Sequence, residues 1–202
     1  MRTIAEMLIL ILLTPVLGNC GKKAAGTTQQ PDTIGANPNL ADPSIYFEKG
    51  TYYLYGTGGG NKDDGFKVFT SADKINWIDR GYALLKGAAY GESGFWAPQV
   101  FKHNGKYYMA YTANEHIAIA TGTSPMGPFT QEVKQPVDAT IKTIDPYVFF
   151  DEASGKMFLY HVRLINGNNI YVAELNQDLS AIKNNTLAPC INATEPWEDT
   201  QK

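Results

Sequence analysis

The chain has 202 residues and a formal net charge of −3, with 17 Lys and Arg against 20 Asp and Glu. This length suits one folded domain, and the lack of a basic cluster argues against nucleic acid as a partner. The 12 Tyr, 3 Trp, 19 Gly and 11 Pro favour an all-β protein whose surface stacks on flat, neutral ligands such as sugar rings.

The chain begins with a predicted targeting segment. Arg2 precedes an apolar run over residues 7–13 that is too short to span a membrane. This arrangement is typical of a signal peptide, which we place at residues 1–19. We therefore expect secretion across a bacterial inner membrane.

Cys20 is the expected site of lipidation, because a leucine and a glycine shortly before it resemble a bacterial lipobox. Asn19 departs from the usual small residue, so ordinary secretion remains the alternative. Residues 20–36 are predicted to be a flexible tether. The protein is thus expected to be a periplasmic or outer-membrane lipoprotein that contacts the membrane only through its lipid. Cys190 then has no disulfide partner and is predicted to be a packing residue.

One sequence pattern occurs three times within residues 37–202. Prolines follow Asp42, Ala97 and Asp145, and each proline opens a short apolar strand, a turn containing glycine and a tyrosine-rich second strand. The three starts lie 55 and 48 residues apart, a period typical of β-propeller blades. Equivalent positions of successive blades face one axis, so Asp42 and Asp145 are predicted to meet in one pocket.

The three copies predict eleven strands and no amphipathic helix. The expected strands are 44–47, 51–56, 66–71 and 77–81 in the first copy, 99–102, 106–112 and 116–121 in the second, and 147–150, 156–161, 169–175 and 182–185 in the third. Propellers have about four to eight blades, so three copies do not close a ring. We therefore expect this chain to be the N-terminal part of a longer propeller protein.

The paired aspartates suggest glycoside hydrolysis. That reaction uses one carboxylic acid to protonate the leaving oxygen and one carboxylate to activate water. The alternative is that Asp-Pro is a common turn starter, which for a single occurrence is the better interpretation. Two occurrences at the same place in two repeats favour a functional pair.

The segments around residues 41–57, 94–113 and 144–160 resemble the first three blades of glycoside hydrolase family 43. The resemblance implies a five-bladed β-propeller that removes arabinose, xylose or galactose units from polysaccharides with inversion. It implies that Asp42 is the general base, and that Asp145 orients the general acid and tunes its pKa. It implies no required cofactor. A Ca²⁺ ion on the propeller axis would depend on a fifth-blade histidine, so no metal ligand is assigned in this chain.

The family's general acid is a glutamate followed by Gly-Pro at the start of the fourth blade, and this motif is absent. Glu195 lies near the expected position, but the polar sequence after it does not start a strand, so we predict that Glu195 is in a loop. The acid is then expected beyond Lys202, and the 202-residue chain alone is expected to be inactive or nearly so.

Aromatic residues near the blade starts are candidates for sugar binding. Trp96 directly precedes Ala97, where the resemblance implies a ring that stacks on sugar; the alternative is a core aromatic between blades. Phe66 follows a glycine-rich acidic loop and either lines the same pocket or packs in the core. Trp77 is predicted to be structural. Three further side chains are weaker pocket candidates: His116, His161 and Arg163.

The leading hypothesis is therefore an inverting glycosidase acting on a polysaccharide or oligosaccharide that contains arabinose or xylose. The alternative is a surface glycan-binding lipoprotein that has lost catalysis. A protein-interaction scaffold is the third possibility, against which the paired aspartates argue. The sequence does not indicate the linkage, exo or endo action, or the oligomeric state.

Overall fold

The computed structural model of the chain describes residues 33–61, 63–165, 167–195 and 197–198. Within these residues the only helical segment is a single 3₁₀ turn, η1 (Asn184–Thr186), so the predicted all-β class is confirmed. None of the described helical structure is long and apolar enough to cross a membrane. The signal peptide and Cys20 lie outside the described residues, and both predictions about them stay predictions.

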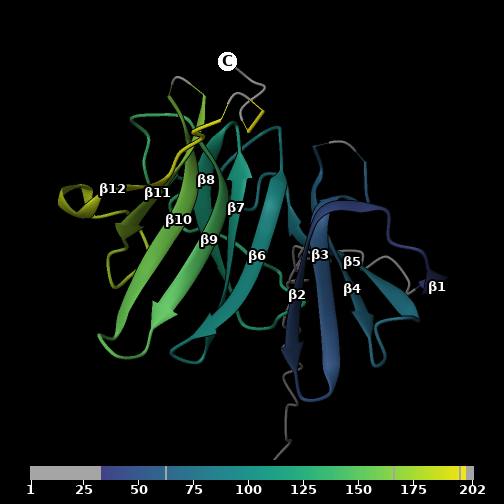
Figure 1. Cartoon of the computed structure of the whole chain (residues 1–202). Helices are drawn as coiled ribbons and strands as arrows, with labels where there is room; N and C mark the ends of the chain where they lie inside the picture. The colour runs from purple at the N-terminus through teal and green to yellow at the C-terminus, as the bar shows by residue number, and fades with distance from the viewer. Residues whose placement is uncertain (1–32, 62, 166, 196, 199–202) are drawn as a thin grey trace, which may run out of the picture.

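The strands form three antiparallel sheets, which we call blades 1, 2 and 3 (Figure 1). Blade 1 has the strand order β1-β5-β4-β3-β2, blade 2 has β6-β7-β8, and blade 3 has β12-β11-β10-β9. The bounds are β1 Thr33–Ala36, β2 Leu40–Glu48, β3 Thr51–Gly58, β4 Gly65–Ser71, β5 Trp77–Leu85, β6 Trp96–His103, β7 Lys106–Ala113, β8 His116–Gly122, β9 Thr143–Asp151, β10 Lys156–Leu164, β11 Asn168–Glu174 and β12 Ala188–Ile191.

The first strand of each sequence repeat is an edge strand of its sheet. These strands are β2, β6 and β9, and β6 contacts both of the others. In Figure 1, β6 stands between blade 1 on the right and blade 3 on the left. The three repeats are therefore arranged as successive blades, with equivalent strands side by side.

Each of these strands carries a bulge at the proline-flanked position. The strand register shifts between Ala41 and Ser44 in blade 1, between Trp96 and Gln99 in blade 2, and at the matching point of β9 and β10. The residues in the three bulges, Asp42, Ala97 and Asp145, have φ of 46°, 46° and 56°. Such left-handed backbone is uncommon outside glycine, so the three repeats share an unusual local structure.

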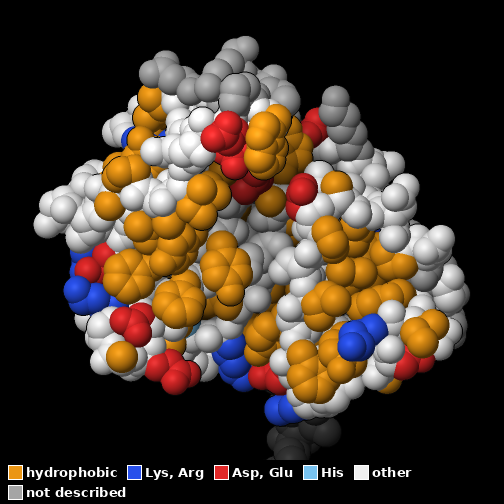
Figure 2. Space-filling model, viewed as in Figure 1, with side chains coloured by type: hydrophobic (Ala, Val, Ile, Leu, Met, Phe, Trp, Pro, Cys, Tyr) orange, Lys and Arg blue, Asp and Glu red, His pale blue; other side chains and the backbone are white. Residues whose placement is uncertain are grey.

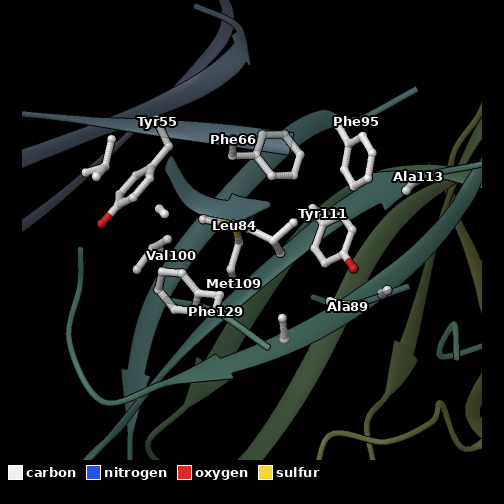
Figure 3. Packing of buried hydrophobic residues seen from close by; sticks show 14 of the residues in the cluster. Tyr55, Phe66, Leu84, Ala89, Phe95, Val100, Met109, Tyr111, Ala113 and Phe129 are labelled. Atoms are coloured by element: carbon white, nitrogen blue, oxygen red, sulfur yellow. The ribbon is translucent and has the colours of Figure 1, made fainter. Parts of the chain in front are cut away.

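Large aromatic side chains fill the interface between blades 1 and 2. Phe66 from β4 meets Phe95 and Tyr111 edge-on, with ring centroids 5.7 and 5.5 Å apart. Figure 3 shows these three rings together in one buried cluster with Tyr55 and Met109. A second buried cluster joins blades 2 and 3 through β7, β8, β9, β10 and β11. The two clusters fix the blades relative to one another and thereby position the bulges.

Three details differ from the sequence prediction. Ordered structure begins before residue 37, because β1 pairs with β5 within the predicted tether. The last strand of blade 3 is Ala188–Ile191 and not 182–185, where Ile182 makes a single bridge to Leu175 and the chain then forms η1. The prediction for Cys190 is wrong, because this residue is exposed on β12 and is not packed.

Candidate active site

Asp42 and Asp145 occupy equivalent bulges in blades 1 and 3, one on each side of blade 2. The pKa of Asp145 is raised, chiefly by loss of hydration in its surroundings and further by the negative charge of Asp42. A charge affects the pKa of another group only when it lies nearby, so the two carboxylates lie in one region of the structure. Acidic side chains also gather at the upper end of the hollow between the flanking blades in Figure 2.

Thr57, the second-last residue of β3, links Asp42 to blade 2. Its hydroxyl donates a hydrogen bond to Asp42 Oδ2 over 2.7 Å and accepts one from the backbone N–H of Ala97 over 2.9 Å. A carboxylate that accepts a hydrogen bond from a fixed donor has a restricted orientation. The Asp42 side chain is therefore oriented by a residue of its own blade that is itself hydrogen-bonded to blade 2.

A cleft with a volume of about 760 Å³ opens beside Thr57, and neither Asp42 nor Asp145 is among its lining residues. Its walls are the loop after β3, the residues leading into β6, and Asn114 and Glu115 in the β7–β8 turn. Thr57 and Trp96 both line it, and Trp96 is 37% exposed. This volume suits a small ligand. The structure thus places the predicted stacking residue beside the residue that holds Asp42.

Gly94 lies close to the Trp96 ring. Its φ is 63°, and a Cβ atom built on it lies 3.2 Å from Trp96 Cζ2. The backbone N–H of Gly94 donates to Asp63 Oδ1 over 2.6 Å. Asp63 belongs to the glycine-rich acidic loop of blade 1. This loop therefore fixes the backbone of Gly94 next to the Trp96 ring.

Phe66 does not share the exposure of Trp96. Its side chain has no exposed surface, and it packs in the core between blades 1 and 2. The sequence left two alternatives for Phe66, and the structure supports core packing. The prediction that Phe66 contacts substrate is therefore wrong. Trp77 is also buried, against Leu54 and Phe69, as its structural interpretation predicted.

The three weaker histidine and arginine candidates do not line the cleft. His116 is half-buried, and its Nδ1 lies 2.9 Å from the backbone oxygen of Asn114. His161 is buried on β10, and burial lowers its pKa. Arg163 is buried and pairs with Asp138, with 3.3 Å between Nη1 and Oδ2. These three side chains are therefore not placed to contact a ligand in the cleft.

Glu195 lies in the loop after β12, as predicted, and its backbone N–H donates to Glu198 Oε2 over 3.0 Å. Among the described residues, no group of three or more His, Cys, Asp or Glu side chains is arranged to hold a metal ion.

Sequence reasoning missed Thr57, Asp63 and Gly94. A signal for Thr57 was present, because Thr57 and Thr112 are 55 residues apart, the same spacing as Asp42 and Ala97. No comparable signal existed for the other two, since their roles depend on a contact between loops of different blades.

Residues 36–201 match the model of glycosyl hydrolases family 43. An arabinoxylan arabinofuranohydrolase of Bacillus subtilis is 31% identical over 75% of this chain and 38% of its own length. An endo-1,4-β-xylanase structure from Bacteroides thetaiotaomicron is 46% identical with a TM-score of 0.76, over 82% of this chain and 56% of that one. An endo-arabinase structure from the same organism is 28% identical with a TM-score of 0.66, over 75% and 56%. The chain thus spans about half of these relatives or less.

Proposed function

Because the chain belongs to glycosyl hydrolases family 43, we propose that its protein hydrolyses glycosidic bonds in polysaccharides or oligosaccharides that contain arabinose or xylose. The observation that carries the proposal is the placement of Asp42 and Asp145 in equivalent bulges, with Thr57 joining Asp42 to a cleft walled by Trp96. Relatives named for arabinose- and xylose-containing substrates support this choice of sugar.

Asp42 is proposed as the general base. Thr57 occupies one of its oxygens, Oδ2, which leaves Oδ1 to accept a proton from a water molecule. That water attacks the anomeric carbon from the face opposite the leaving group, and the configuration inverts. Inversion requires the base and the acid to stand about 6.5–9.5 Å apart, with room for the water between them.

Asp145 is proposed to act on the general acid. Its raised pKa follows from loss of hydration and from the charge of Asp42. When ionised, it in turn disfavours ionisation of any neighbouring carboxylic acid, which keeps that acid able to donate its proton. The acid itself is not assigned to a residue of this chain.

Trp96 is proposed to stack on a sugar ring, because its exposed face forms part of the cleft wall. Sugar rings present apolar C–H faces that pack on aromatic side chains, while their hydroxyls bind polar groups such as Asn61 and Asn114 elsewhere in the lining. Anchoring to a membrane through lipid on Cys20 is part of the same proposal, since it would keep the enzyme at the cell envelope.

The deciding experiment uses protein expressed from the complete reading frame that contains this chain. Hydrolysis of aryl α-L-arabinofuranoside or aryl β-D-xyloside is followed, and proton NMR identifies the first anomer released. Turnover with inversion, lost in Asp42→Asn, is the expected result. Binding of arabinoxylan without turnover of any of these substrates would favour the glycan-binding alternative.

A further inference from the structure

Blades 1 and 2 each have a threonine as the second-last residue of their second strand, Thr57 in β3 and Thr112 in β7. The two threonines make the same kind of contact to the next blade. Thr57 pairs with Ala41 across blade 1, and Thr112 pairs with Trp96 across blade 2, so they are equivalent. Each hydroxyl accepts the backbone N–H of the next blade's bulge residue. Thr57 accepts from Ala97 over 2.9 Å, and Thr112 accepts from Asp145 over 3.0 Å.

The two threonines differ in the side-chain acceptor that the bulge residue of their own blade provides for the hydroxyl hydrogen bond. In blade 1 the bulge residue is Asp42, whose Oδ2 accepts that proton over 2.7 Å. In blade 2 the bulge residue is Ala97, which has no carboxylate. A hydroxyl carries one proton, and the incoming N–H already occupies an acceptor position of Thr57. Its proton is therefore directed at Asp42.

We propose that Thr57 is a positioning residue, which uses a contact common to the blades to orient the Asp42 carboxylate for water activation. This inference rests on the proposed function, in which Asp42 is the base. The hydroxyl fixes Oδ2 and stabilises the ionised carboxylate, which counteracts repulsion from Asp145. Oδ1 then faces the water.

The test compares Thr57→Val with Thr112→Val in the full-length protein. Both changes replace a hydroxyl with a methyl group of similar size and remove one contact between blades. Only Thr57→Val also removes a hydrogen bond to a carboxylate. We expect Thr57→Val to lower kcat by about tenfold to a hundredfold with little change in KM, because the base is misoriented. It should also move the acidic limb of the kcat/KM profile to higher pH.

Thr112→Val is expected to lower kcat less and to leave the acidic limb in place. Thr57→Ser, which retains the hydroxyl, should restore most of kcat and the original pH profile. If Thr57→Val unfolds the protein, Thr57→Ser and Thr57→Ala in the same assay replace it, with the pH profile as readout. Equal losses in Thr57→Val and Thr112→Val with unmoved acidic limbs would show that the threonine only joins the blades.

A second readout does not depend on turnover. The side-chain carboxyl ¹³C resonance of Asp42 is followed against pH in the unmodified protein and in both valine variants. An upward shift of its titration midpoint in Thr57→Val alone supports positioning by Thr57, even if no glycoside is hydrolysed and the proposed function fails. An unchanged midpoint in an active enzyme overturns the positioning role and leaves the glycosidase intact.

Discussion

The bulges of blades 1 and 2 have the same backbone and different chemistry. Asp42 and Ala97 both have φ of 46°, both precede proline, and both lie at the register shift of their strand. Asp42 presents a carboxylate, whereas Ala97 presents a methyl group and follows the exposed Trp96. The backbone form is therefore a property of the blade, and the side chain placed on it decides whether a blade supplies acid–base chemistry or a binding surface.

The largest expected effect is the loss of the blade 1 carboxylate. Asp42→Asn keeps the shape of the side chain and removes its basicity, so kcat should fall by about 10²- to 10⁴-fold, the usual contribution of a general base. Hydrolysis of an aryl glycoside by the full-length protein measures it. The control is Asp151→Asn, the same change at the last residue of β9, where the Asp151 carboxylate accepts hydrogen bonds from the turn that follows. Comparable losses in both variants would contradict the assignment of Asp42.

The next effect tests the binding surface of blade 2. Gly94→Ala places a Cβ 3.2 Å from the Trp96 ring and should displace it, weakening oligosaccharide binding by about two- to tenfold. Isothermal titration calorimetry with an arabino- or xylo-oligosaccharide measures it. Gly87→Ala is the matched control, because Gly87 also has positive φ, 85°, but its Cβ would meet nothing within 4 Å. If both variants bind equally well, Gly94 does not set the tryptophan's position.

A smaller effect concerns the pH dependence of stability. The folded pKa of Asp145 is raised, so the folded chain retains this proton at pH values where the unfolded chain has lost it. Its contribution to stability is therefore present below the unfolded pKa, about 3.9, and is lost as pH rises through the folded pKa.

Asp145→Asn should consequently stabilise the protein slightly at pH 7 and not at pH 3.5. The gain should stay below about 1 kcal/mol, because Asp145 is exposed and solvent screens its charge. Urea denaturation at the two pH values measures it. A gain of the same size at both would mean that the carboxylate charge is not its cause.

The repeat made the fold and the equivalent placement of Asp42 and Asp145 predictable. Asp42 and Asp145 could be placed at one site because equivalent residues of successive blades face a common region, and this follows from spacing alone. Phe66 and Trp96 could not be separated in this way, because both are aromatic residues near a blade start. Burial distinguishes them, since Phe66 contacts Tyr111 of the next blade while Trp96 borders a cleft. The strand at 188–191 was missed because its proline and polar neighbours hide any alternation.

Another small effect tests whether the shared bulge is strained. A left-handed alanine costs about 1 kcal/mol, which glycine does not pay, so Ala97→Gly relieves that strain but adds conformational freedom to the unfolded chain. Ala72 is exposed in the turn after β4, and its φ is not positive, so Ala72→Gly adds the freedom without the relief. The free energy of unfolding of Ala97→Gly should thus exceed that of Ala72→Gly by about 1 kcal/mol.

Equal values in urea denaturation would mean that the bulge accommodates alanine without cost. The expected difference would instead show that blade 2 keeps a strained backbone form at a position where it carries no carboxylate, so that the strain belongs to the repeat and not to catalysis.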